Sequence, residues 1–272
     1  MDCLFGVQHI KTYLTLSAIA LAAAATLTSG TVLAQAAAPA TPEFAVTGNF
    51  GITSDYRFRG LSQNNLDPAV QGGFDVAHSS GLYIGTWGSN VSSWAAGPGS
   101  LELDLYGGYK TTVGDIGLDV GAIAYKYPGS LASTRANTEE LYVGLSYGPA
   151  VLKTSYVIGK NYFASTDSGK DASGTMYYDL TLSQEVAPKL VASLHVGYTD
   201  YKEAATTSTA KVSYTDYSIG LAYDLGSGFT AGAKYFWNDT NPGTKNYAST
   251  GGDNTGTKLY KDGFAVSLTK AF

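Results

Sequence analysis

The chain has 272 residues with a formal net charge of −5, and only 14% of the residues are charged. Soluble domains average about 25% charged residues, so this chain is poor in charge although its hydrophobic share of 44% is ordinary. The difference is made up largely by 33 Gly and 21 Tyr. The scarcity of Lys and Arg leaves no basic surface for nucleic acid, and 12% aromatic residues argue against disorder. This composition indicates many extended strands.

The first 36 residues have the layout of a cleaved secretory signal peptide. Lys11 precedes an apolar stretch over residues 14–27. Small residues that resemble the A-x-A cleavage site of signal peptides follow, with the motif ending at Ala34 or at Ala36. The apolar stretch is shorter than the roughly 20 residues that a transmembrane helix needs. We therefore expect residues 1–36 to be removed, with cleavage after Ala34 or Ala36.

The rest of the chain reads as a short linker followed by one domain. Residues 37–43 are rich in Ala and Pro and predict the linker, and residues 44–272 predict the domain. The domain has no stretch of 18 consecutive apolar residues, so we expect no transmembrane helix in it. Cys3 belongs to the signal peptide, so the mature chain has no cysteine and we expect neither a disulfide nor thiol chemistry.

From residue 44 onward, apolar and polar residues alternate with the period of a β-strand. The first alternating segment is 15 residues long, from Phe44 to Phe58, whereas about 9–11 tilted residues suffice to cross a hydrocarbon layer. Three later segments alternate less regularly. In chain order, the twelve predicted strands are 44–58, 69–78, 82–91, 101–106, 118–125, 140–147, 151–162, 176–183, 190–197, 216–225, 229–238 and 264–272.

The connections between these strands alternate between long and short. Short turns are expected near 78–81, 113–117, 148–150, 187–189 and 226–228. Long loops are expected near 61–68, 90–99, 128–137, 164–174, 202–212 and 239–257. Short periplasmic turns and longer external loops are typical of outer-membrane barrels, and this order places both mature termini on the periplasmic side.

Aromatic residues gather at the long-loop ends of the strands. They are Tyr56 and Phe58, Tyr125 and Tyr127, Tyr162 and Phe163, and Tyr235 to Trp237. Tyrosine has an apolar ring and a polar hydroxyl, so such residues are enriched where a barrel meets the membrane surface. We expect a girdle at the outer interface.

Two all-β folds fit the alternation. A secreted β-sandwich also alternates, but its strands are shorter and its apolar faces pack on each other. Strand length and the even strand count favour an all-β, transmembrane, antiparallel up-and-down barrel of about twelve strands.

The last strand carries a further feature of such barrels. Its apolar residues lie on one face, interrupted by Lys270, and are Phe264, Val266, Leu268 and Phe272. A membrane-facing last strand that ends in Phe is typical of the signal recognised by the barrel-assembly machinery. We therefore expect that machinery and the outer-membrane lipid to be partners.

Four runs of the sequence resemble the TorF-like porin family of proteobacteria. They are Ser54–Gly60 (SDYRFRG), Asp67–Asp75 (DPAVQGGFD), Ser100–Tyr109 (SLELDLYGGY) and Leu141–Pro149 (LYVGLSYGP). The resemblance covers essentially the whole mature chain and implies an outer-membrane β-barrel porin of undefined substrate. It brings no catalytic or ligand-binding residues to transfer.

If the apolar face of each strand meets lipid, the other face lines the lumen. The candidates for pore-lining or constriction residues are Asp55, Arg57, Arg59, Asp75, Glu102, Asp104, Lys110, Asp119, Glu140 and Asp179. Acidic residues outnumber basic ones on this face, which predicts a weak preference for cations.

Arg57 and Arg59 are expected side by side on the inner face of the first strand, opposite acids such as Asp75 or Glu102. Two interpretations remain open. The charges form either a transverse ladder at a pore constriction or a static ion-pair network that fills the lumen.

The sequence offers little for catalysis or metal binding. His78 lies next to two serines in a predicted turn, and His195 shares the inner face with Ser193. Neither histidine has an evident Asp or Asn to orient it, and no nucleophile motif is present. We expect no enzymatic activity, no catalytic residue, no metal site and no cofactor.

The sequence therefore predicts an outer-membrane channel for passive diffusion of small hydrophilic solutes. The alternative is a non-conducting structural or adhesive barrel whose external loops bind partners. Nothing in the sequence assigns an oligomeric state.

Overall fold

The computed structural model describes residues 43–92, 99–132, 136–163, 165–166, 168–202, 213–240 and 259–272. The predicted signal peptide and nearly all of the predicted linker lie outside these residues. No helix in the described part of the chain is long and apolar enough to cross a membrane.

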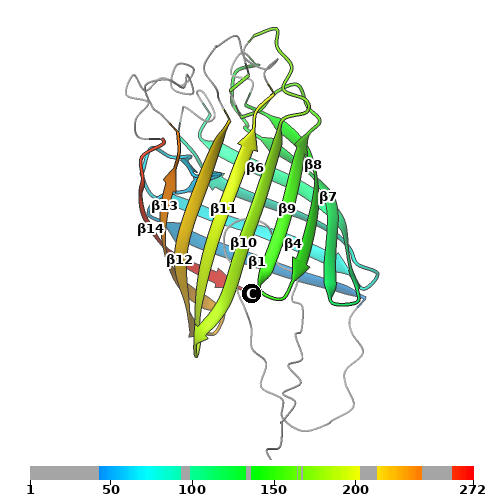
Figure 1. The fold of residues 1–272 in the computed structure, drawn as a ribbon, viewed down its shortest axis with the longest axis vertical. Helices are drawn as coiled ribbons and strands as arrows, with labels where there is room; N and C mark the ends of the chain where they lie inside the picture. Colours follow the sequence, from blue (N-terminus) through cyan, green and yellow to red (C-terminus); the bar gives the residue numbers. More distant parts are fainter. Residues whose placement is uncertain are drawn as a thin grey trace, which may run out of the picture. The chain divides into compact units, whose positions relative to one another are not determined.

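Within the described residues, twelve antiparallel strands form a closed barrel (Figure 1). The strands are β1 (Phe44–Thr53), β4 (Ala69–His78), β5 (Leu82–Asn90), β6 (Leu101–Val113), β7 (Ile116–Lys126), β8 (Thr138–Tyr147), β9 (Ala150–Val157), β10 (Met176–Ala187), β11 (Leu190–Asp200), β12 (Tyr214–Gly226), β13 (Phe229–Asn238) and β14 (Gly263–Ala271). Each strand pairs with its neighbour in this order, and β1 pairs with β14 to close the barrel. The predicted fold class and strand number are confirmed.

The closure depends on a close approach between the two ends of the domain. Gly48 and Phe272 exchange two backbone hydrogen bonds, of 2.8 and 3.0 Å. A Cβ at residue 48 would lie 2.6 Å from the Phe272 ring, so only glycine lets this ring lie against β1. The C-terminus lies at the short-turn end of the barrel (Figure 1).

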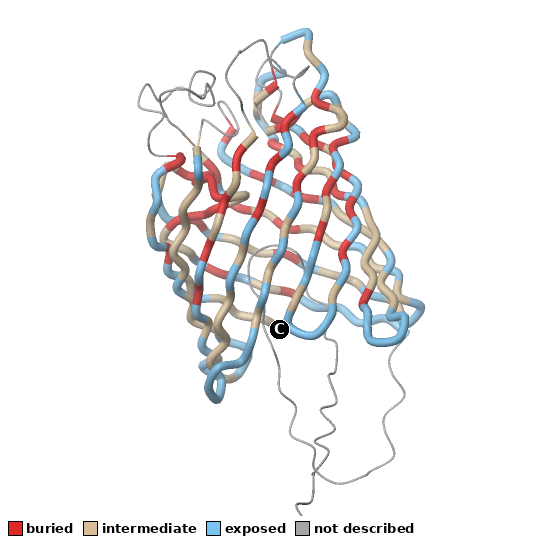
Figure 2. Tube along the Cα trace, viewed as in Figure 1, coloured by how far each residue is buried: buried red, intermediate tan, exposed pale blue. Residues whose placement is uncertain are grey.

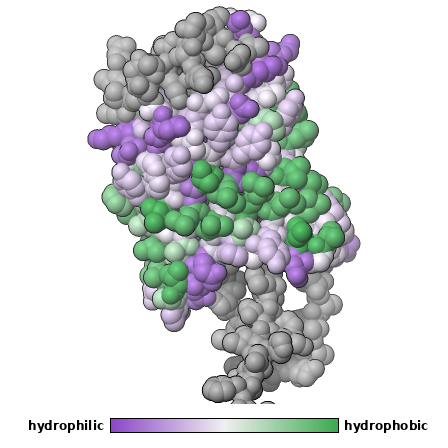
Figure 3. All heavy atoms as spheres, viewed as in Figure 1, coloured by the Kyte–Doolittle hydropathy of each residue, from purple (hydrophilic) through white to green (hydrophobic). Residues whose placement is uncertain are grey.

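The outer surface of the barrel is apolar in a broad belt (Figure 3). On β8, Leu141, Val143 and Leu145 are exposed, whereas Glu140 and Tyr142, which alternate with them, are buried on the inner side. Soluble monomers rarely expose a continuous apolar surface of this kind. The predicted assembly residues Phe264, Val266, Leu268 and Phe272 are all exposed, and their recognition by assembly machinery stays a prediction.

The first strand is shorter than predicted. It ends at Thr53 instead of continuing to residue 58, and residues 57–58 and 61–62 form a separate two-stranded hairpin, β2 (Arg57–Phe58) and β3 (Leu61–Ser62). The turn of this hairpin lies at Arg59 and Gly60, which have φ of 49° and 77°. The predicted strand 151–162 likewise ends early, at Val157.

Burial is uneven along the barrel (Figure 2). On the inner face of β6, Glu102 and Asp104 are buried, whereas Tyr106 and Lys110, nearer the short-turn end, are half-buried. The interior is therefore densely packed toward the long loops and more open toward the short turns.

Candidate functional site: a hairpin inside the barrel

Residues 54–66, here called the inner hairpin, leave the wall after β1 and fold into the lumen. The Leu61, Ser62 and Asn64 residues are at most 7% exposed. These residues belong to a predicted external loop, so the expectation that the loop lies outside the barrel is wrong for them.

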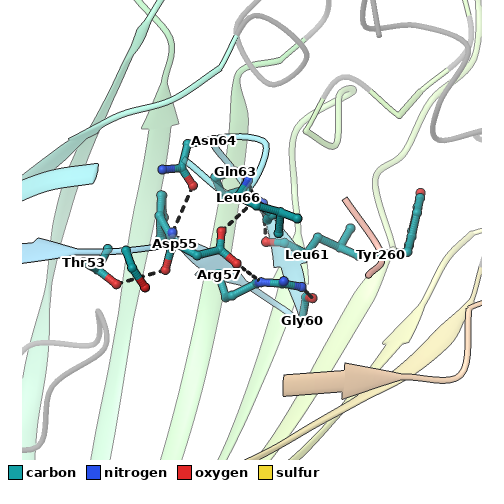
Figure 4. Close-up of polar contacts among 12 residues, drawn as sticks. Thr53, Asp55, Arg57, Gly60, Leu61, Gln63, Asn64, Leu66 and Tyr260 are labelled. Atoms are coloured by element: carbon teal, nitrogen blue, oxygen red, sulfur yellow. Dashed lines mark hydrogen bonds and ion pairs between the residues drawn. The ribbon is translucent and has the colours of Figure 1, made fainter. Parts of the chain in front are cut away.

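The inner hairpin is held in shape by its own polar groups (Figure 4). The Tyr56 amide donates to Asn64 Oδ1 at 2.9 Å, and the Ser62 hydroxyl donates to Asp55 Oδ1 at 2.6 Å. Arg57 forms an ion pair with Asp55, and its Nη1 donates to the Gly60 carbonyl at 3.2 Å. These bonds satisfy buried polar groups, whose burial without a hydrogen-bond partner would cost folding free energy.

Arg59 attaches the tip of the inner hairpin to the far wall. Its Nη1 and Nη2 donate to the two carboxylate oxygens of Glu140 on β8 at 2.9 and 2.7 Å. Its Nη1 also donates to the Tyr162 hydroxyl at 2.9 Å, and the guanidinium lies 4.3 Å from the centre of the Tyr177 ring on β10. A bidentate Arg–carboxylate pair fixes both position and orientation.

Other contacts reach the wall on both sides of this pair. The Tyr56 hydroxyl donates to Glu102 on β6 at 2.8 Å, and the Tyr214 hydroxyl on β12 donates to the Arg59 carbonyl at 2.9 Å. Gly60 lies against Asp216 on β12, where an added Cβ would approach the Asp216 Cβ to 2.5 Å. The inner hairpin thus contacts β6, β8, β10 and β12, and it extends across the lumen.

The pairing predicted for the two arginines is wrong. Arg57 and Arg59 contact Asp55 and Glu140, not Asp75 or Glu102. The Asp75 carboxylate instead accepts a hydrogen bond from Tyr106 at 2.7 Å. The reason is that the chain leaves the wall at Ser54, which carries both arginines away from the register of β1.

The predicted aromatic girdle is also partly wrong. Tyr56, Tyr125, Tyr127 and Tyr162 are buried inside, around the inner hairpin. The Phe58 ring lies 5.5 Å from the Tyr125 ring, in an edge-to-face arrangement. These residues pack around the inner hairpin instead of facing lipid.

Different tyrosines lie on the outside at this level. Tyr156, Tyr178 and Tyr198 are exposed near the long-loop ends of β9, β10 and β11. Tyr217 stacks on Trp237 with ring centres 5.3 Å apart. An aromatic surface therefore exists, and of the predicted residues Tyr235 and Trp237 take part in it.

Toward the short turns, the inner wall carries looser polar contacts. The Tyr83 hydroxyl donates to Asp119 at 2.6 Å, and Lys110 Nζ lies 3.7 Å from the same carboxylate. Lys110 Nζ also lies 4.5 Å from the centre of the Tyr83 ring. These side chains are only partly buried, so water screens their charges.

His195 lies between two carboxylates. Its Nε2 lies 3.0 Å from Asp216 Oδ1 and its Nδ1 lies 3.3 Å from Asp179 Oδ1. The expectation that no Asp orients this ring is wrong, because β10 and β12 flank β11 and both carboxylates project inward. The alternation of these three strands, which places all three side chains on the inner face, was the sequence signal that could have indicated this contact.

Among the described residues, no group of three or more His, Cys, Asp or Glu is arranged to hold a metal.

The predicted pore-lining residues fall into two layers. Those of the packed layer, which lie in or against the inner hairpin, are Asp55, Arg57, Arg59, Glu102, Asp104 and Glu140. Those of the more open layer are Asp75, Lys110, Asp119 and Asp179.

Residues 36–272 match the model of a family described as "Bacterial protein of unknown function (Gcw_chp)". No curated protein sequence matches the chain. Among solved structures, a NanC porin is similar with a TM-score of 0.51 and 11% identity, covering 84% of this chain and 99% of that one.

Two further solved structures are less similar. A KdgM porin has a TM-score of 0.49 and 5% identity, with 83% of this chain and 99% of that chain covered. An outer membrane channel from Pseudomonas putida F1 has a TM-score of 0.46 and 12% identity, with 88% and 100% covered. At such low identity the NanC likeness shows the fold alone.

Proposed function

The chain belongs to the Gcw_chp family of bacterial proteins of unknown function, and we propose that it is an outer-membrane channel for passive diffusion of small hydrophilic solutes. The observation that carries the proposal is a closed barrel with an apolar outer belt, a charged lumen and a hairpin folded across that lumen. The sequence resemblance to TorF-like porins supports the same function.

The inner hairpin acts as the constriction of this channel. Loops folded into a barrel narrow the lumen and bring charged side chains close to the passing solute. Here Arg59, Glu140 and Asp104 come from distant parts of the chain into one buried layer. Solutes of small size are therefore the expected cargo.

The proposal includes a weak preference for cations. Of the ten predicted pore-lining residues, seven are acidic and three are basic. The excess of carboxylates makes the interior negative, and water in the open layer limits the effect.

The location follows from the same features. We infer export by the predicted signal peptide, insertion with the help of barrel-assembly machinery, and an orientation with both mature termini in the periplasm. The apolar belt supports contact with outer-membrane lipid.

Two measurements test the proposal. Purified protein in a planar bilayer should give discrete ion-conducting steps, with a reversal potential of the cation-selective sign under a KCl gradient. Liposome swelling with neutral sugars and amino acids of increasing size should show a size limit. Heat-denatured protein and detergent alone serve as controls. A refolded barrel that gives neither conductance nor swelling would contradict the channel.

The alternative function is a non-conducting barrel whose external loops bind partners. The tight packing of the inner hairpin, in which Ser62 is completely buried, favours it. Two kinds of variant separate the functions. Loss of partner binding with unchanged permeability after removal of external loops favours the alternative, whereas loss of ion selectivity only on charge reversal of Arg57 or Asp104 favours the channel.

A further inference from the structure

Two carboxylates on β6 lie in the packed layer without a cationic partner. Glu102 and Asp104 are two residues apart on the inner face and are 2% and 4% exposed. Neither forms an ion pair with any described residue, whereas Asp55, Asp119, Glu140 and Asp179 each lie within 4.0 Å of a basic or imidazole nitrogen. A buried carboxylate without compensation is strongly destabilising.

The two carboxylates differ in how far they are satisfied. Glu102 accepts hydrogen bonds from the Tyr56 and Tyr127 hydroxyls, both at 2.8 Å. Asp104 Oδ1 is buried and has no hydrogen-bond partner among the described residues. Each carboxylate oxygen has two lone pairs, so acceptor capacity remains on both residues. A ligand that supplies positive charge would relieve this arrangement.

The surroundings of Asp104 indicate the kind of ligand. In the strand register, Asp104 lies directly opposite Trp87 on β5 and Tyr125 on β7, and both aromatic side chains are buried on the inner side. Aromatic faces attract cations, including ammonium groups. The next inward residue on β6, Tyr106, is half-buried, so Asp104 lies at the edge of the packed layer that faces the open layer.

We propose that Glu102 and Asp104 form a binding site for a small monovalent cation, an alkali ion or a primary ammonium group, that passes through the channel. The site deepens the proposed function, because it makes Asp104 the residue that sets the cation preference. Asp55, Asp119, Glu140 and Asp179 already have basic or imidazole partners, and Asp75 is bonded to the Tyr106 hydroxyl, so these acids contribute mainly to the overall negative potential of the lumen.

The first test compares two substitutions with the same change of charge. D104N removes the unpartnered carboxylate, and D75N removes a lumen carboxylate that is half-buried and bonded to Tyr106. Under a KCl gradient in a planar bilayer, D104N should lower the potassium-to-chloride permeability ratio about threefold or more, and D75N should change it much less. Equal effects of the two variants would overturn the site.

Ethylammonium and tetramethylammonium distinguish the two candidate ligands, an alkali ion and a primary ammonium group. Ethylammonium has N–H donors for Asp104 Oδ1, and tetramethylammonium has none. If ethylammonium slows the potassium current of the wild type but not of D104N, the site takes ammonium groups. If both organic ions pass without effect and only the potassium preference depends on Asp104, the site takes alkali ions.

A second readout does not require conduction. The heat-unfolding midpoint of the detergent-solubilised wild type should rise when KCl replaces tetrabutylammonium chloride at constant ionic strength, because a ligand that binds only the folded state stabilises it. D104N should lose this rise, and D75N should keep it. A wild-type midpoint that is independent of potassium, together with an unchanged selectivity in D104N, would overturn the site. Absence of any current with a potassium-dependent midpoint would instead contradict the channel alone.

Discussion

The two halves of the lumen are built from the same strands but are held together by different forces. In the packed layer, Arg59 and Glu140 are nearly inaccessible to water and are joined by two hydrogen bonds. In the open layer, Lys110 and Asp119 are 27% and 18% exposed and lie 3.7 Å apart. Charge pairs therefore stabilise the fold strongly where water is excluded. Where water enters, they add little stability and mainly change the electrostatic potential of the lumen. Substitutions should have large effects in the first layer and small ones in the second.

The largest effect is expected from breaking the pair between Arg59 and Glu140. R59A leaves the Glu140 carboxylate buried without its counter-charge, which costs about 3–5 kcal/mol of folding free energy. The inner hairpin loses its attachment to β8, so single-channel conductance should rise several-fold. Bilayer recordings and the heat-unfolding midpoint measure the two consequences.

R59K is the matched control for that change. It keeps the positive charge but cannot form the bidentate pair, so conductance should lie between those of the wild type and R59A. If R59A leaves both conductance and midpoint unchanged, the pair does not hold the inner hairpin.

A smaller effect is expected from a single methyl group at Gly60. G60A places a Cβ about where the Asp216 side chain lies, at a residue with φ of 77°. The expected cost is roughly 1–3 kcal/mol for the displaced packing, together with the strain of the left-handed backbone. The unfolding midpoint should fall and the conductance should become noisier.

Gly148 provides the comparison for this prediction. It lies in the turn between β8 and β9 with φ of 54°, and a Cβ there would meet nothing within 4 Å. G148A therefore carries only the backbone strain. Equal losses of stability in G60A and G148A would show that Gly60 is not tightly packed.

His195 connects the two layers, and its removal should have an intermediate effect. H195A leaves Asp216, which is 2% exposed, with hydrogen bonds from Tyr177 at 3.2 and 3.4 Å but without the imidazole. A buried acceptor that loses a partner costs about 1–3 kcal/mol. The midpoint should fall, while an increase in conductance comparable to that of R59A would contradict the separation of the layers.

The smallest effect is expected from Lys110. K110A removes a partly exposed pair whose contribution is about 1 kcal/mol or less. We expect an almost unchanged midpoint and a slight gain in cation selectivity, measured from the reversal potential at low salt. A loss of stability as large as that of R59A would remove the distinction between the layers.

The barrel could be predicted from the sequence because the alternation within each strand shows which of its side chains face outward and which face the lumen. Alternation of apolar and polar residues is local, and most of the predicted strands overlap the observed ones closely. The inner hairpin could not be found this way, because Ser54, Tyr56 and Phe58 continue the alternation of β1. Its direction is decided by contacts with Glu140 and Tyr214, which are 81 and 155 residues away from Arg59.

The burial of the aromatic residues could not be predicted for the same reason. Tyr125 and Tyr162 have the composition and position of an interface girdle, and only the presence of the inner hairpin makes the inside the better place for them. The run of polar turn-forming residues Ser62 to Asn65 was the signal that could have indicated a folded loop.

The most direct test of the inner hairpin as the constriction is its removal. Thr53 and Ala69 are directly opposite each other in the pairing of β1 with β4, so a tight turn of about four residues can replace residues 54–68. Single-channel conductance of this variant in a planar bilayer should exceed that of the wild type several-fold, with a weaker dependence on solute size in liposome swelling. A folded variant whose conductance equals that of the wild type, or that does not conduct at all, would contradict the inner hairpin as the constriction of a channel.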